Sequence, residues 1–122
     1  MSANKYNAKK IVVDGITFDS KTEAGYYLLL KGKQKKGEIE SLDLQQEFIL
    51  LDAFTHKATG KKYRKTVYTA DFVITYKGKD GEIHTKVVEV KSKATAKARD
   101  YGLRKKLFVL RYPDIEFEEV IV

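Results

Sequence analysis

The sequence predicts a mixed α/β domain, and three observations support this. Short apolar runs that end at Gly or Asp are typical of strands separated by turns. Ser20 followed by Glu23 is a helix-capping pattern, and Pro113 ends a second helical stretch. The chain has 122 residues, 43% of them apolar. That is enough for one hydrophobic core, so we expect a single domain over residues 1–122.

The first third of the chain predicts a hairpin followed by a helix. Ile11–Val13 and Ile16–Phe18 flank Asp14-Gly15, a dipeptide that favours a two-residue turn. We expect the helix to begin after the N-cap Ser20 and to end at Gly37. Within it, Tyr26–Leu30 is apolar all round, so this helix needs burial on more than one side. A dimer contact is one way to supply it.

The rest of the chain predicts further strands and one more helix. The expected strands are Leu42–Leu51, Val67–Tyr76, Ile83–Lys91 and Ile115–Val122. We expect a polar loop over Asp52–Tyr63 and a turn over Lys77–Gly81. A helix is expected over Thr95–Arg111, although Leu107–Leu110 has a strand as its alternative.

Composition narrows the possible chemistry. The chain has no cysteine, which excludes disulfides, iron–sulfur clusters and cysteine-based zinc sites. His56 and His84 are its only histidines. A bound metal should therefore be a hard cation held by carboxylates. Residues 1–10 lack the apolar core of a signal peptide, and no apolar run is long enough to cross a membrane, so we expect a cytoplasmic location.

The charge balance points to a polyanionic partner. The chain carries 24 Lys and Arg against 17 Asp and Glu. The basic residues cluster in several places: Lys31–Lys36, Lys57–Lys65, Lys91–Arg99 and Arg104–Lys106. Such clusters favour binding to nucleic acid, and the alternative is a lysine-rich surface that only confers solubility.

Glu89 and Lys91 end the apolar segment Lys86–Lys91. Side chains alternate along a strand, so both project from one face. A carboxylate can hold Mg²⁺ there, and an ammonium can orient the attacking water or neutralise a phosphate. The alternative is an ion pair at a solvated strand end.

Asp71 lies inside the apolar strand that precedes Glu89. Asp is depleted in strands, and burying its carboxylate is costly unless it is paired or bound to a metal. Its alternative role is a structural pair with Lys91 across the hairpin. Glu23, in the first turn of the expected helix, is a third acid at an informative place, and its alternative role is to cap the helix as the partner of Ser20.

Taken together, Asp71, Glu89-Val90-Lys91 and the upstream Glu23 resemble the motif of the PD-(D/E)XK nuclease superfamily. More narrowly, three stretches are similar to a small phage and prophage endonuclease family related to Holliday junction resolvases: Val13–Ala24, Tyr68–Phe72 and Tyr101–Leu107. The sequence departs from the superfamily motif at Ala70, where proline often stands.

The resemblance implies a mixed four- to five-stranded sheet flanked by helices, with a restriction-endonuclease-like core. It implies Mg²⁺- or Mn²⁺-dependent cleavage of DNA, branched or four-way junctions in particular, by a homodimer inside a bacterial host. By position, Asp71, Glu89 and Glu23 are the expected metal ligands, and Lys91 is the expected catalytic lysine. The residues expected to contact DNA are Lys61, Lys62, Arg64, Lys65, Ser92, Lys93, Lys97, Arg99 and Lys105. Tyr101, Gln45 and Gln46 are weaker candidates.

Two other classes of function stay open. One is a nicking or restriction-like nuclease. The other is a noncatalytic basic module for DNA binding or phage assembly, in which the acids are only structural.

The site requires a particular strand register. A two-residue Asp80-Gly81 turn would pair Asp71 with Val90 and send its side chain away from Glu89. A three-residue loop, Lys79–Gly81 with Gly81 left-handed, places Asp71 opposite Glu89. We therefore predict the odd-length loop, with the two Cβ atoms about 4.5–5.5 Å apart.

Overall fold

A computed structural model describes residues 10–122, so the expectation that residues 1–10 are not a signal peptide falls, except for residue 10, outside the described part. Its centre is a four-stranded mixed sheet in the order β3-β6-β7-β8. β3 (Ser41–Leu51), β6 (Thr66–Lys77) and β7 (Ile83–Lys91) pair antiparallel, and β8 (Glu116–Ile121) runs parallel to β7. The predicted mixed α/β class is confirmed.

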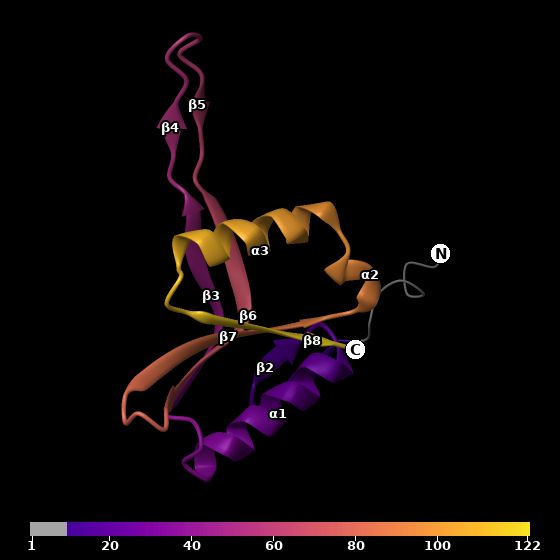
Figure 1. The fold of residues 1–122 in the computed structure, drawn as a ribbon. Coiled ribbons are helices and arrows are strands. Elements are labelled where there is room, and N and C mark those ends of the chain that lie inside the picture. The colour runs from indigo at the N-terminus through magenta and orange to yellow at the C-terminus, as the bar shows by residue number, and fades with distance from the viewer. Residues whose placement is uncertain (1–9) are drawn as a thin grey trace, which may run out of the picture.

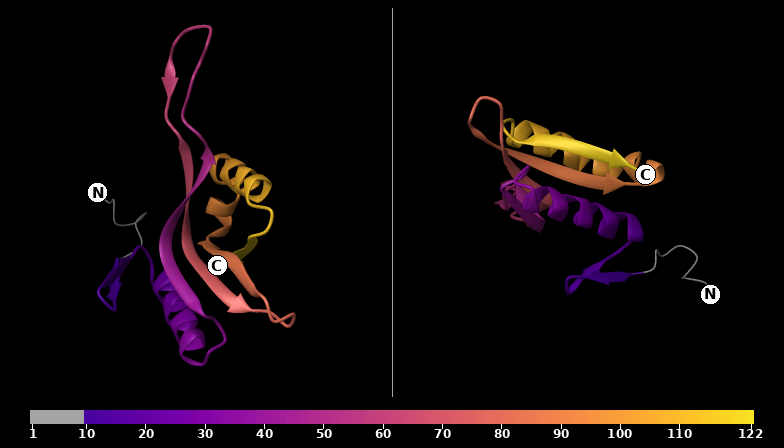
Figure 2. Two further views of the ribbon diagram at one scale, coloured as in Figure 1. Left: turned by 90° about the vertical axis from the view of Figure 1, so that its left-hand side faces the viewer. Right: turned by 90° about the horizontal axis from the view of Figure 1, so that it is seen from below.

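Helices cover both faces of this sheet (Figures 1 and 2). α1 (Lys21–Lys35) lies on one face, and α2 (Lys93–Ala96) and α3 (Arg99–Arg111) lie on the other. The hairpin of β1 (Ile11–Val13) and β2 (Ile16–Phe18) packs beside α1. None of the helices in residues 10–122 is both long and apolar enough to span a lipid bilayer.

Local sequence signals explain the first elements. Asp14 and Gly15 both have positive φ, of 53° and 75°, which is the geometry that the two-residue turn requires. Ser20 Oγ accepts a hydrogen bond from the Glu23 amide at 3.1 Å, so the predicted N-cap is confirmed. Gly37 follows the helix with φ of 79°.

The sheet divides the core in two. On the α1 side, Tyr27 and Leu30 pack with Phe72 and Val88 of the sheet. On the α3 side, Phe108 is fully buried among aromatic and aliphatic side chains of the strands: Phe48, Tyr68, Val73 and Val87. The sheet is therefore buried on both faces, which explains why its central strands are apolar on successive residues.

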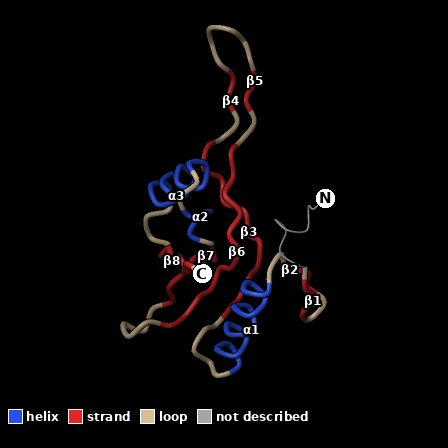
Figure 3. Tube along the Cα trace, turned by 90° about the vertical axis from the view of Figure 1, so that its right-hand side faces the viewer, coloured by secondary structure: helices blue, strands red, loops and turns tan. Residues whose placement is uncertain are grey.

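The structure corrects two predicted elements. The helix expected over Thr95–Arg111 is two helices, because the chain turns at Lys97 and Ala98, and Ala98 is extended, with ψ of 136°. Leu107–Leu110 is helical, so its strand alternative is wrong. The expected loop Asp52–Tyr63 instead contains β4 (Phe54–Thr55) and β5 (Lys62–Tyr63), which form a projecting ribbon (Figures 1 and 3).

The apolar segment of α1 is only partly covered within one chain. Tyr27 and Leu30 are buried, whereas Leu28 and Leu29 are about half exposed. The sheet buries one side of the helix. The homodimer that was expected to cover the other stays a prediction.

Candidate active site

The candidate site forms where the strands on either side of Asp71 stop pairing with it. Followed from the β6–β7 loop, the ladder ends at the pair Phe72 and Val88, so it stops one residue short of Asp71. The β3–β6 ladder passes from Leu44 to Gln46 and omits Gln45, which faces Asp71 and has φ of 54°. Asp71 therefore lies in the central strand without a ladder partner on either side.

Where the ladder is interrupted, two backbone amides donate hydrogen bonds to side-chain carboxylates instead of to backbone carbonyls. The Val90 amide donates to Asp71 Oδ2 at 2.9 Å, and the Asp71 amide donates to Glu89 Oε1 at 3.3 Å. An unpaired buried amide is costly, so these two carboxylates stabilise the opening between β6 and β7. They also bring two acidic side chains from adjacent strands together.

Glu89 is the most deeply buried charged residue at this site, at 2% exposure. Its carboxylate accepts hydrogen bonds from Tyr68 Oη and from the Asp71 amide, and Lys91 Nζ lies 3.1 Å from its Oε2. Burial and the neighbouring Asp71 charge raise the pKa of Glu89, while Tyr68 and Lys91 oppose the rise. A carboxylate held this deep needs such partners to remain charged.

Glu23 reaches the same point from the first turn of α1. Burial raises its pKa most, a hydrogen bond with Asp71 opposes that rise, and the charge of Glu89 adds to it. Burial also raises the pKa of Asp71, to about 6, with the charge of Glu23 contributing. Three carboxyl groups on three different elements thus perturb one another's ionisation.

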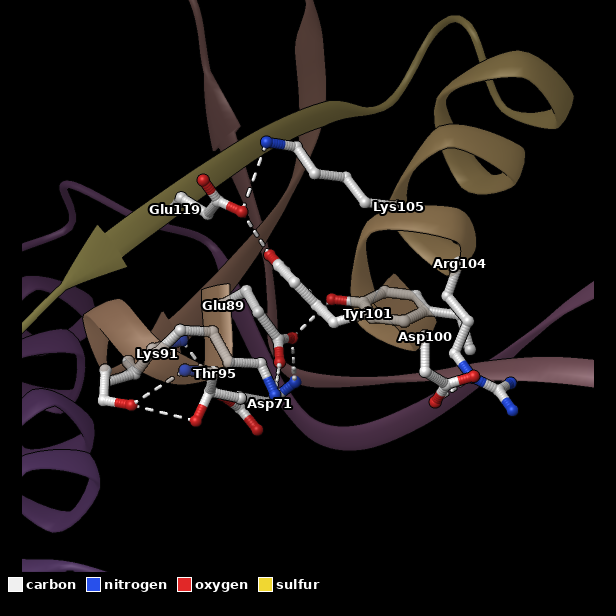
Figure 4. A network of polar contacts seen from close by, with 12 residues as sticks. Asp71, Glu89, Lys91, Thr95, Asp100, Tyr101, Arg104, Lys105 and Glu119 are labelled. Atoms are coloured by element: carbon white, nitrogen blue, oxygen red, sulfur yellow. Dashed lines mark hydrogen bonds and ion pairs between the residues drawn. The ribbon is translucent and has the colours of Figure 1, made fainter. Parts of the chain in front are cut away.

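A second layer of contacts holds Lys91 in place (Figure 4). Lys91 Nζ lies 5.0 Å from the centre of the Tyr101 ring, a cation–π distance. The Tyr101 hydroxyl donates to Glu119 Oε2 at 2.5 Å, and Lys105 Nζ lies 3.2 Å from the same oxygen. Helix α3 is thereby tied to β8 beside the lysine, which restricts where Lys91 can point.

The predicted odd-length loop and its register are confirmed, but the predicted pair of Asp71 with Glu89 is not formed within the ladder. Lys77 pairs with Ile83, and Phe72 with Val88, so the same register continued would place Asp71 opposite Glu89. The Gly78 amide donates to Glu82 O at 2.8 Å and Gly81 has φ of 82°, as the three-residue loop requires. Because the ladder opens before Asp71, the close Cβ pairing expected there stays a prediction.

Of the predicted site residues, the structure brings Glu23, Asp71, Glu89 and Lys91 together. The alternative pair of Asp71 with Lys91 is not the one formed, since the Lys91 ammonium pairs with Glu89. Gln45 faces Asp71 from β3, and both Gln45 and Gln46 are exposed.

The predicted DNA contacts fall into three groups. Lys61, Lys62, Arg64 and Lys65 lie on or beside the projecting ribbon. Ser92, Lys93, Lys97 and Arg99 follow β7 around α2, where Ser92 Oγ caps the helix by accepting from the Thr95 amide at 3.1 Å. Lys105 is ion-paired with Glu119, so its first role in the structure is to hold α3 against β8.

Two residues of the site were not predicted from the sequence. Tyr68 has little signal, because it lies three residues before Asp71 in β6 and simple alternation would place the two side chains on opposite faces. Glu119 has no sequence signal at all. It is the strand partner of Glu89 only because β8 runs parallel to β7, and residue spacing does not reveal such a long-range contact.

The donor set suits a hard divalent cation. No three acidic, histidine or cysteine side chains within residues 10–122 are already grouped as a metal site. Mg²⁺, however, is commonly held by one or two protein carboxylates, with waters and substrate phosphates completing its shell. Asp71 and Glu89 supply such a pair, and their mutual repulsion is what a bound cation would relieve.

Comparison with known proteins places the chain in a family without assigning an activity. No curated protein and no solved structure matches the chain significantly. Residues 3–122 match a family described as "Protein of unknown function (DUF1064)". Since the match extends over nearly the whole chain, the protein belongs to the DUF1064 family.

Proposed function

We propose that this protein is a metal-dependent endodeoxyribonuclease with a restriction-endonuclease-like core. The observation that supports the proposal most is the opening between β6 and β7, where Asp71 and Glu89 meet beside Lys91. A buried, mutually repelling carboxylate pair costs stability, so its presence favours a functional site over a structural one, and the adjacent ammonium favours chemistry on an anion.

In this proposal Asp71 and Glu89 hold Mg²⁺ or Mn²⁺, with Glu23 as a further acid. When bound, the cation supplies Lewis-acid polarisation of the scissile phosphate and of the attacking water. Tyr68 keeps Glu89 oriented through its hydroxyl, and the Val90 amide does the same for Asp71. The ligands are therefore positioned before any cation arrives.

Lys91 orients the nucleophile or neutralises charge that develops on the phosphate. The Lys91 side chain is about a quarter exposed, so it can turn from Glu89 toward a bound phosphate. The Tyr101 ring limits this motion to the neighbourhood of the site. Basic residues around α2 hold the DNA backbone without reading its bases: Lys93, Lys97 and Arg99.

The finer substrate assignment rests on the sequence resemblance. We propose that the preferred substrate is branched DNA, four-way junctions above all, in the cytoplasm of a bacterial host that carries a phage or prophage. Two cuts at a symmetric junction need two active sites at fixed separation, which a two-fold homodimer provides.

We expect Asp71→Asn and Lys91→Ala each to abolish cleavage while leaving DNA affinity within about twofold. Affinity comes from distributed basic residues, whereas the chemistry needs these two groups. The assay is cleavage of linear, flapped and four-way DNA with Mg²⁺ or Mn²⁺, and binding is measured in EDTA. Lys79→Ala, on the distant β6–β7 loop, is the control and should cut like the wild type. Near wild-type cleavage by either site variant would refute the assignment.

A noncatalytic DNA-binding module is the second candidate, and one observation favours it. Glu89 already has three protein partners, as a purely structural buried acid would. If no DNA is cut with either metal while basic substitutions still weaken binding, this candidate replaces the nuclease.

A further inference from the structure

The ribbon formed by residues 52–65 projects from the molecule as a separate arm (Figures 2 and 3). All of its residues are exposed. Its root is tied to α3, where Arg111 Nη2 lies 3.4 Å from Asp52 Oδ2 and Arg104 donates to Val67 O. The arm is therefore anchored at its base, and its own residues are not buried in the core.

The arm has internal structure that a spacer loop would not need. Phe54 and Tyr63 pair across the two strands with their rings stacked, 5.0 Å apart and 12° from parallel. At the tip, the His56 amide donates to Lys61 O at 2.8 Å, and Gly60 closes the turn with φ of 73°. A two-stranded ribbon is marginal alone, so the ring pair and the tip turn hold it in shape.

Much of the excess positive charge lies on this arm. It contains five basic residues, Lys57, Lys61, Lys62, Arg64 and Lys65, against the single acid Asp52, while the whole chain has a formal net charge of +7. Asp52 is engaged by Arg111. The arm thus presents an almost purely cationic surface, which fits a polyanion.

The charges lie on both faces of the ribbon. Lys61 Nζ is 5.0 Å from the Tyr63 ring, so Lys61 shares the Tyr63 face. Side chains alternate, so Lys62 and Arg64 project from the opposite face. A ribbon that docks flat would need only one charged face. Two charged faces suit a ribbon inside a groove with phosphates on either side, and the major groove of B-DNA admits a two-stranded ribbon.

The arm also has a suitable reach. Lys61 and Asp71 are ten residues apart along nearly continuous β structure, at most about 33 Å. One helical turn of duplex DNA is about 34 Å. A duplex that places one phosphate at the carboxylate site would therefore reach the arm less than one helical turn away from that phosphate.

We propose that residues 52–65 grip double-stranded DNA through the major groove, within one helical turn of the carboxylate site. The placement relative to the carboxylates rests on the proposed function, whereas the grip itself does not. Phe54 and Tyr63 brace the ribbon, and its lysines and Arg64 contact phosphates on both sides.

The test compares two full-length variants that each lose four lysines. The arm variant carries Lys57→Gln, Lys61→Gln, Lys62→Gln and Lys65→Gln. The control, on α1 and its C-cap at the other end of the molecule, carries Lys31→Gln, Lys33→Gln, Lys35→Gln and Lys36→Gln. Binding to a labelled duplex of about three turns is measured by anisotropy in EDTA, from about 50 to about 200 mM salt.

We expect the arm variant to lose at least about tenfold in affinity at low salt, and its salt slope to become shallower by about 2–4, at 0.9 per lost phosphate contact. The control slope should change by less than about 1. Equal losses in both variants would overturn the proposal, because overall charge would then explain binding. Duplex RNA should bind the arm weakly, since its major groove is narrow. Arm-dependent binding as tight to RNA as to DNA would overturn the groove assignment.

A second measurement needs no variant. Bound duplex should protect Lys57 and Lys61 of the wild-type chain from an amine-labelling reagent, while Lys35 and Lys36 stay reactive. Unprotected arm lysines would refute the grip. If the arm variant binds DNA more weakly but no DNA is cut, the arm proposal stands and the nuclease proposal fails. If DNA is cut but the arm variant binds like the wild type, the nuclease proposal stands and the arm proposal fails.

Discussion

Asp71 is the residue at which local stability and the proposed chemistry conflict. It occupies a strand position that disfavours Asp, both of its ladder partners are missing, and burial raises its pKa to about 6. The fold therefore bears a cost at this residue. Such costs are typical of functional sites rather than of structural ones.

Asp71→Asn should stabilise the metal-free protein at neutral pH. The folded-state pKa lies above the ordinary value of 3.8, so the native state favours the protonated acid. The contribution of the protonated Asp71 carboxyl to stability is therefore complete below about pH 4 and is lost as the pH rises through about 6. Asn cannot ionise and retains an oxygen for the Val90 amide. Urea unfolding in EDTA should show a gain of about 1–2 kcal/mol at pH 7.5 and little gain at pH 4, with allowance for partial exposure.

Asp114→Asn, in an exposed turn, is the matched control for the loss of one carboxyl group and should change the unfolding free energy by less than about 0.5 kcal/mol. If the wild type and Asp71→Asn show the same pH dependence, the carboxyl at position 71 is not the strained group.

At the scale of elements, the β6–β7 loop determines whether the site exists. The loop has three residues between Gly78 and Glu82, and this odd number aligns Asp71 with Glu89. A loop shorter by one residue would turn every β7 side chain to the other face. Gly81 makes the loop possible because its φ of 82° is unfavourable for residues with a Cβ.

Gly81→Ala should therefore destabilise the protein by about 1–2 kcal/mol. Gly102→Ala is the comparison, because Gly102 is exposed inside α3 and an added Cβ there meets no atom within 4 Å. It should stabilise by up to about 1 kcal/mol. Thermal or urea unfolding measures both, and a shift of the same sign in the two variants would contradict this account of the loop.

At the scale of the whole molecule, one sheet joins two cores, and the site lies where they meet. Glu23 comes from the α1 side, while Tyr68 and Tyr101 come from the side of α3. Neither layer contains the site by itself. Its geometry therefore depends on how tightly each helix packs against the sheet.

Phe108→Ala tests the packing of α3. Phe108 is completely buried against Phe48 and Tyr68, so its truncation should cost about 3–5 kcal/mol. Leu110→Ala, two residues along and 77% exposed, should change stability by less than about 0.5 kcal/mol. Denaturant unfolding compares them, and similar small losses in both would mean that α3 is only loosely docked.

The sequence by itself determined the features that short-range chemistry controls. The Asp14-Gly15 turn, the Ser20 cap and the Gly37 stop are each specified by a few adjacent residues. The odd-length loop at Gly81 is not, because Asp80-Gly81 also fits a two-residue turn, and its length was predicted from the alignment of Asp71 with Glu89 that the proposed site requires. The grouping of Asp71 with Glu89 and Lys91 follows from that loop, because register is arithmetic once the turn is known.

Only the tertiary structure decided what depends on distant segments. Strand pairing at residues 54 and 63, the break between α2 and α3, and the parallel contact of β8 with β7 leave weak local signals. The opening of the ladder at Asp71 is likewise a property of three strands together. Burial then sets the ionisation of the carboxylates, because desolvation is produced by the neighbours that folding assembles and not by the residue itself.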